Sequence, residues 1–235
     1  VERFMRGFLR AGDVVLDVGA NIGSLAMLAA SCVGPGGRVI AVEPLERNRR
    51  LPARAAQPSR IDQVELIEAA AASGTGELEL RTHPLTSNSA RPAASGALLR
   101  DARGRTVRVP MVVLEEALAG LARLDLVKID IEGMEPLALH GFERSLGRLR
   151  PVLLSEFHPW AMERASDTSP VDYLHWLRRF YPAITILHRD GRRERCIEPE
   201  AVMQAWRDAN ARAGLGDRLH LDLLLEPEDP RGAAA

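Results

Sequence analysis

Val14-Val15-Leu16-Asp17-Val18-Gly19-Ala20-Asn21-Ile22-Gly23 carries the clearest signal of the fold of this chain. Its first half is short, apolar and rich in β-branched residues, as a buried parallel strand is. Its glycines allow a tight turn, and Leu25, Leu28 and Ala29 then recur at the spacing of a helix near 22–33. A strand, a glycine turn and a helix in this order present free backbone N–H groups at a helix N-terminus, where nucleotide-like ligands bind.

The residues of the turn indicate which nucleotide-like ligand it suits. The dinucleotide pattern G-x-G-x-x-G is absent, because Asn21 and Ser24 stand where that pattern needs glycine. Asp17, at the end of the strand, would repel the pyrophosphate of NAD and attract the ammonium group of S-adenosylmethionine (SAM). The turn therefore favours SAM, and the alternative is that Asp17 only caps a turn that binds no ligand.

A second apolar strand, predicted over 38–43, ends in Glu43. An acidic residue about 20 residues beyond the glycine turn accepts hydrogen bonds from ribose hydroxyls. Because NAD and SAM both carry an adenosine ribose, Glu43 alone does not separate them. Together with Asp17 and Asn21, it favours SAM.

Length and composition set limits on the class of protein. With 235 residues, 46% of them hydrophobic, the chain can form one well-buried domain over 1–235. The helix-like opening leads us to expect further residues upstream of Val1. A net charge of −1 provides no basic field for nucleic acid or an anionic membrane. Cys32 and Cys196 fit no metal or redox spacing, and no apolar run is long enough to span a bilayer. We expect a cytoplasmic protein that binds neither nucleic acid nor membrane.

The alternation of elements predicts a doubly wound α/β sheet. We expect strands over 14–18, 38–43, 63–69, 124–131, 151–157, 183–188 and 218–225, and helices near 22–33, 45–56, 134–147, 169–180 and 199–213. The alternation lapses between 76 and 113, where 76–81 and 106–113 predict an inserted β-hairpin. The long segment 83–105 between them is expected to close over a substrate or to be a surface loop.

Acidic residues also follow the two central strands predicted over 124–131 and 151–157. Asp130 and Glu132 come at the end of the first, and Glu156 and His158 at the end of the second. Ligands of open α/β sheets bind outside the carboxyl ends of strands, so these side chains are expected to lie near the glycine turn. They could deprotonate a hydroxyl or hold Mg²⁺. His158 could instead only begin a helix, and for Glu135 helix capping is favoured.

Four motifs in this order, VVLDVGANIG, VIAVEP, LVKIDIEGME and RPVLLSEFHP, resemble the FkbM family of SAM-dependent methyltransferases. The resemblance runs from about Gly12 to Pro159. It implies a class I, Rossmann-like methyltransferase fold, with a seven-stranded sheet whose last strand is antiparallel. It also implies O-methylation of small molecules, often sugar or polyketide hydroxyls of secondary metabolism.

The resemblance further implies which residues surround SAM. Those expected near the methionine part, the ribose and the adenine are Asp17, Gly19, Ala20, Asn21, Gly23, Glu43, Pro44, Glu68, Ala69, Ala70 and Asp130.

The chemistry of a sulfonium sets what the protein must supply. Its methyl group is already activated, so the enzyme mainly aligns an acceptor oxygen in line with the S–CH₃ bond. We expect Asp130, Glu156 or His158 to act as the base, or as ligands of an activating Mg²⁺. The alternatives are an NAD-dependent oxidoreductase on a similar fold and a non-catalytic scaffold.

Overall fold

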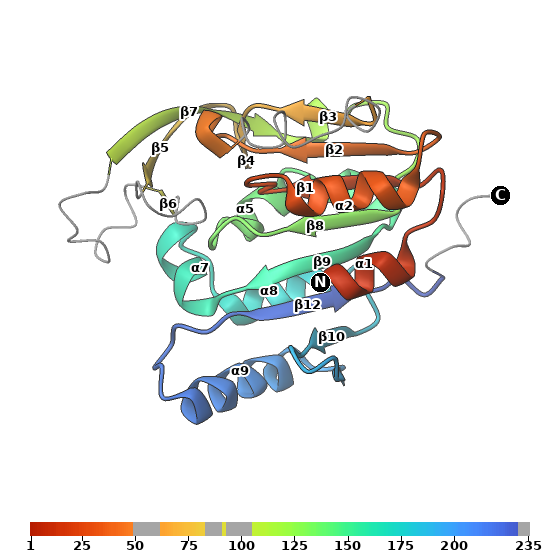
Figure 1. The fold of residues 1–235 in the computed structure, drawn as a ribbon. Coiled ribbons are helices and arrows are strands. Elements are labelled where there is room, and N and C mark those ends of the chain that lie inside the picture. Colours follow the sequence, from red (N-terminus) through yellow and green to blue (C-terminus); the bar gives the residue numbers. More distant parts are fainter. Residues whose placement is uncertain (49–61, 83–90, 93–104, 230–235) are drawn as a thin grey trace.

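A computed structural model describes residues 1–48, 62–82, 91–92 and 105–229 of the chain. Within them, eight strands form one main sheet in the order β11-β10-β12-β9-β8-β1-β2-β3 (Figure 1). The strands are β1 (Val14–Val18), β2 (Arg38–Val42), β3 (Val64–Ile67), β8 (Leu126–Ile129), β9 (Val152–Phe157), β10 (Ile184–Leu187), β11 (Arg193–Cys196) and β12 (Leu221–Leu225).

The five neighbouring strands β9, β8, β1, β2 and β3 are parallel. Strand β12 runs antiparallel to β9 on one side and to β10 on the other. This confirms the predicted class I sheet with its antiparallel last strand. The structure adds an eighth strand, β11, which pairs with β10 as an antiparallel edge hairpin. The sequence RERC of β11 alternates charge with little apolar content, so hydrophobic periodicity gave no signal for it.

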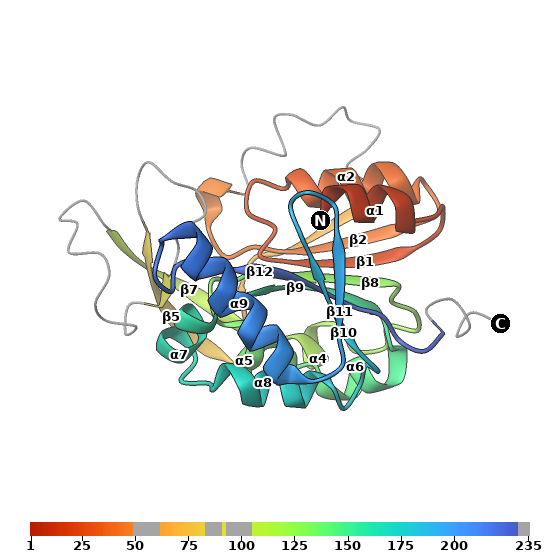
Figure 2. The ribbon, with the colours of Figure 1, turned by 90° about the horizontal axis from the view of Figure 1, so that it is seen from below.

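Helices cover both faces of the main sheet (Figure 2). On one face lie α1 (Glu2–Phe8) and α2 (Ser24–Val33); on the other lie α4 (Leu114–Ala117), α5 (Glu135–His140), α6 (Glu143–Leu149), α7 (Pro159–Ala165), α8 (Pro170–Leu177) and α9 (Pro199–Ala213). Each face buries its own apolar cluster, because alternate residues of the central strands point to opposite sides. Such burial is the main stabilising contribution to a fold of this kind.

Two predicted helices differ in the structure. The helix expected near 134–147 is two short helices, α5 and α6, separated at Gly141. A Cβ at Gly141 would lie 2.5 Å from the carbonyl oxygen of Ala72, so glycine is needed where the chain passes this backbone. The helix expected near 45–56 begins at Glu46 and is described only as far as Asn48; its remainder lies outside the described residues.

A second sheet stands at one end of the main sheet (Figure 1). It has the order β4-β7-β5-β6, formed by β4 (Ala70–Ala72), β5 (Gly76–Thr82), β6 (Arg91–Pro92) and β7 (Arg105–Val113). The antiparallel pairing of β5 with β7, from Gly76↔Met111 to Thr82↔Arg105, confirms the predicted hairpin insertion. Most of the segment 83–105, expected to close over a substrate, lies outside the described residues.

Throughout the described ranges, no helix combines the length and apolar character that crossing a membrane requires.

Candidate functional site

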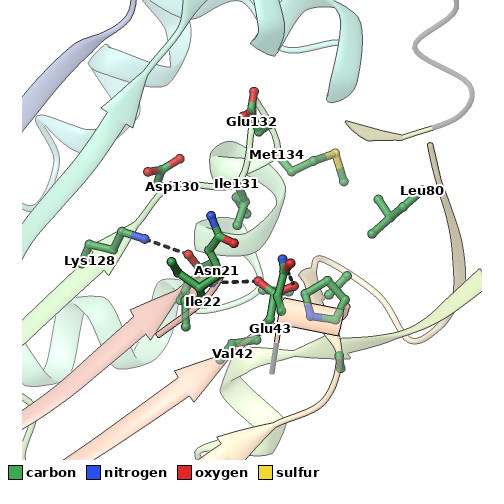
Figure 3. A pocket seen from close by; sticks show the side chains of 18 of the residues that line it. Asn21, Ile22, Val42, Glu43, Leu80, Lys128, Asp130, Ile131, Glu132 and Met134 are labelled. Atoms are coloured by element: carbon green, nitrogen blue, oxygen red, sulfur yellow. Dashed lines mark hydrogen bonds between the residues drawn. The ribbon is translucent and has the colours of Figure 1, made fainter. Parts of the chain in front are cut away.

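A pocket of about 330 Å³ opens at the carboxyl ends of β1, β2 and β8. The glycine turn after β1, the ends of β2 and β8, and the start of β4 form its walls, and Leu78 and Leu80 of β5 add an apolar side (Figure 3). The inserted hairpin therefore forms part of the pocket. Ligands of open α/β sheets bind at this edge.

The glycine turn is shaped by positions that few residues can occupy. Gly19 has φ +78°, and a Cβ there would lie 2.0 Å from the carbonyl oxygen of Asp130. Glycine is thus required where the turn after β1 touches the turn after β8. Asn21 also has positive φ, +52°, a conformation that asparagine tolerates better than most residues. Its Oδ1 is buried and accepts no hydrogen bond from the described residues, which leaves an acceptor ready for a ligand donor.

Glu43 lies at the end of β2 and is buried. One carboxylate oxygen accepts the backbone N–H of Asn21 at 2.9 Å. The other accepts the N–H of Leu45 at 2.8 Å and the side-chain amide of Asn48 at 3.1 Å. Burial raises the pKa of Glu43, and these hydrogen bonds oppose that shift. A carboxylate offers about four acceptor positions, so Glu43 both fixes the glycine turn and keeps capacity for a ligand hydroxyl (Figure 3).

Asp17 lies beneath the pocket rather than on its wall. It is fully buried, and its Oδ1 lies 3.1 Å from Nζ of Lys128, the residue beside it in the parallel pairing of β1 with β8. Nζ also donates to the carbonyl oxygen of Gly19 at 2.9 Å. Although burial lowers the pKa of Lys128, the nearby charges of Asp17, Asp130 and Glu156 outweigh it, so the net shift is upward.

Sequence reasoning missed Lys128, which lines the pocket. It is the only lysine of the chain and lies within the quoted motif LVKIDIEGME. The available signal was a single lysine within an otherwise apolar strand, since a buried ammonium group needs a partner.

The other residues expected around SAM divide between the pocket wall and its surroundings. Ala20, Pro44, Ala69 and Ala70 line the pocket together with Gly19, Asn21, Glu43 and Asp130. Gly23 does not line it; with φ +79° it instead forms the N-cap of α2. Glu68 is exposed and also lies off the wall. The alanines that follow it, not its carboxylate, shape that side of the pocket.

Acidic residues gather where β8 ends. Asp130 and Glu132 line the pocket, and Glu132 adopts a positive φ of +58°. Glu135 is fully buried, and its Oε1 accepts the backbone N–H of Ile131 at 2.7 Å. Burial, with a contribution from Asp130 and Glu132, raises the pKa of Glu135 to about 8. Helix capping is the interpretation that the sequence favours for Glu135; the carboxylate instead bonds to the turn before α5, and the N-cap of that helix is Met134.

The predicted bases of β9 lie in different surroundings. Glu156 is largely buried, and burial followed by the charge of Asp130 raises its pKa well above the ordinary value. Its Oε1 lies 3.1 Å from Nδ1 of His220, a residue that sequence reasoning missed. His158 is buried at the N-cap of α7, with its ring 5.9 Å from that of Trp160. Neither Glu156 nor His158 lines the pocket.

The expected Mg²⁺ site gains no support from the geometry. Among the residues that the structure describes, no three or more His, Cys, Asp or Glu side chains are arranged to hold a metal ion.

The pocket residues fit SAM. The buried Asn21 oxygen accepts no hydrogen bond from the part of the chain that the structure describes. Together with the carboxylates at the ends of β2 and β8 and the backbone cradle at Gly19, it suits a ligand with hydroxyls at one end and a cationic group at the other. None of these groups favours a pyrophosphate.

Comparison with known proteins agrees with this geometry. The family model described as the methyltransferase FkbM domain matches residues 17–191. No curated protein matches the chain significantly.

The chain is similar in structure to methyltransferase FkbM from Methylobacillus flagellatus KT, with 15% identity and a TM-score of 0.53. The match covers 96% of this chain and 50% of that one, so this chain spans half of that protein's length. It is also similar to a protein from Streptococcus mutans assigned as a methyltransferase, in complex with S-adenosylhomocysteine (SAH). There the TM-score is 0.52 at 8% identity, covering 96% of this chain and 94% of that one.

The structural likenesses show a class I methyltransferase fold. A likeness of fold alone does not exclude an NAD-dependent dehydrogenase. The match to the FkbM methyltransferase model does exclude it. Since that model matches most of the sequence, this chain belongs to the FkbM family of SAM-dependent methyltransferases.

Proposed function

We propose that this chain transfers a methyl group from SAM to a hydroxyl of a small molecule, of the sugar or polyketide type. The observation that carries the proposal is the pocket whose wall combines Asn21, Glu43 and Asp130 at the carboxyl ends of three adjacent strands. In this proposal Glu43 accepts ribose hydroxyls, and Asn21 with Asp130 faces the ammonium group. Ala69 and Ala70 leave a shallow apolar wall for the adenine.

The chain's own residues have a limited task in this reaction. When bound, SAM supplies a methyl carbon already activated by its sulfonium. The protein orients the acceptor oxygen for in-line attack and receives the hydroxyl proton as the new bond forms. Carboxylates near a sulfonium also lower the free energy of the bound cation. Glu156, which follows Asp130 on the neighbouring strand, is the group we assign to the acceptor side.

Methyl transfer is tested with deuterated-methyl SAM and a panel of methyl glycosides and macrolactone alcohols, followed by mass spectrometry. We expect the labelled methyl on an oxygen of at least one acceptor, with SAH as co-product. Titration with NADH, followed by its fluorescence, is expected to show no binding. A chain that binds NADH but neither SAM nor SAH in calorimetry would contradict the proposal.

A further inference from the structure

His220 lies immediately before β12, where the chain is held firmly. The residue that precedes it, Leu219, has both backbone groups bonded to buried side chains of α9. The indole N–H of Trp206 donates to the Leu219 carbonyl at 2.6 Å, and Oδ1 of Asn210 accepts the Leu219 N–H at 3.0 Å. The position of His220 at the end of the sheet is therefore fixed by the core.

The pairing of β12 with β9 brings His220 to Glu156. Asp222 lies directly opposite Glu156 in the antiparallel ladder, and residues two apart on a strand share a face. Nδ1 of His220 accordingly lies 3.1 Å from Oε1 of Glu156. A carboxylate at Nδ1 fixes the orientation of the ring and leaves Nε2 as the free nitrogen. The His220 side chain is 40% exposed, so solvent or a substrate can reach the ring.

Charged groups surround this His220–Glu156 pair on the sheet edge. From β8 and the turn after it come Asp130, Glu132 and Glu135, which all act on Glu156. The cation of Lys128 acts in the same network. Asp222 lies opposite Glu156 on β12 itself. In the parallel pairing of β8 with β9, Ile129 lies opposite Ser155, so Asp130 and Glu156 come next to each other at the ends of the two strands. Asp130 lines the pocket, and the His220–Glu156 pair therefore lies beside the site assigned to SAM, just outside its wall.

His158, the histidine expected from the sequence to act as base, lies in a less accessible place. It is only 6% exposed at the start of α7, whereas His220 presents a much larger share of its side chain. A base must come within hydrogen-bond reach of the proton that it removes. Between the two histidines near the end of β9, accessibility favours His220.

We propose that His220, oriented by Glu156, is the general base that removes the proton from the acceptor hydroxyl. This inference rests on the proposed O-methylation. As the acceptor oxygen bonds to the methyl carbon, the carbon–sulfur bond breaks and its electron pair stays on sulfur, which gives SAH. The hydroxyl proton passes to Nε2 of His220 and then to solvent. The positive ring and the Glu156 carboxylate attract each other through Nδ1, and this attraction opposes the upward shift that burial gives the pKa of Glu156.

The test uses two small alcohols as acceptor probes, ethanol and the more acidic trifluoroethanol, with SAH release followed by mass spectrometry. His220→Ala is compared with His175→Ala, which removes an exposed histidine of α8 whose ring contacts Glu200 in a similar pair. Calorimetry with SAM is run on each protein. Imidazole is then added to each variant, because a small base can replace a missing histidine ring but cannot repair a misfolded site.

For His220→Ala we expect SAM affinity within about threefold of wild type and SAH release from ethanol roughly 100-fold slower, the usual contribution of a general base. The loss with trifluoroethanol should be smaller, because that alcohol needs less help to lose its proton. Added imidazole should restore His220→Ala at least about tenfold, while His175→Ala should match wild type throughout.

Three results would overturn the inference while leaving SAM binding intact: a wild-type rate in His220→Ala, a loss that imidazole does not rescue, or a wild-type protein that converts neither alcohol. Absence of SAM binding in the wild-type protein would instead contradict the proposed function itself, so the two failures are distinguishable.

Discussion

At the scale of single residues, the site depends on a few buried polar groups that serve two purposes. Glu43 accepts the backbone N–H of Asn21 and so holds the glycine turn in the shape that the pocket requires. Lys128 neutralises Asp17 beneath the same turn and bonds to the carbonyl of Gly19. A buried carboxylate or ammonium without such a partner would cost several kcal/mol. The groups that shape the turn are therefore inseparable from those that face a ligand.

Glu135 gives a residue-scale prediction about pH. In the folded chain its pKa is raised to about 8 from the ordinary value of 4.5. Between these pH values the folded state holds a proton that the unfolded state has lost, so the free energy of unfolding falls as pH rises from 5 to 8. Glu135→Gln still offers an oxygen to Ile131 N–H but cannot titrate.

We expect this substitution to reduce the fall in unfolding free energy between pH 5 and pH 8 by on the order of 1–3 kcal/mol. Urea denaturation of both proteins at the two pH values measures it. Stability curves that fall in parallel would show that Glu135 is not the titrating group.

At the scale of elements, α9 acts as the anchor of β12. Its buried Trp206 and Asn210 bond both backbone groups of Leu219, and β12 then fills the space between β9 and β10. The helix thus places His220 although its own side chains stay away from the pocket.

Strand β9 is connected to α8 by a pair of buried hydroxyls. The hydroxyls of Ser155 and Tyr173 lie 3.2 Å apart.

Asn210→Ala tests this anchor. The substitution leaves the Leu219 N–H without its acceptor and removes the side-chain bond to the Trp206 carbonyl, and an unsatisfied buried group costs about 1–3 kcal/mol. We expect a loss of unfolding free energy in that range, measured by urea denaturation. Gln204→Ala, which removes an exposed amide bond to Asp208 on the same helix, should change stability by no more than about 0.5 kcal/mol. Equal effects of both variants would refute the anchor.

At the scale of the whole molecule, the sheet gathers distant segments at one edge. The turn after β1, the ends of β2 and β8, and the inserted hairpin meet there around one pocket. Parallel strands bring their carboxyl ends to a common edge, so the motifs that stand far apart in the sequence become neighbours. The His220–Glu156 pair continues this edge through β9 and β12.

The sequence predicted this arrangement where the signal was local. Apolar strands bounded by turns located β1, β2, β8 and β9, and the polar residues at their ends led to Asn21, Glu43 and Asp130. Contacts that depend on tertiary pairing were missed. Lys128 meets Asp17 only through the register of β1 with β8, and His220 meets Glu156 only because β12 inserts antiparallel beside β9. Neither pairing leaves a periodic trace in the sequence.

Binding of SAM in the pocket at the glycine turn can be measured by calorimetry of SAM with Glu43→Ala. Glu65→Ala is the matched control. It removes an exposed carboxylate of β3, which pairs with Arg38 of the neighbouring strand β2. Circular dichroism checks that both variants are folded.

We expect Glu43→Ala to weaken SAM binding about 10- to 100-fold, the effect of losing hydrogen bonds to a charged acceptor, with Glu65→Ala unchanged. A folded Glu43→Ala protein with wild-type affinity for SAM would contradict binding of SAM in this pocket.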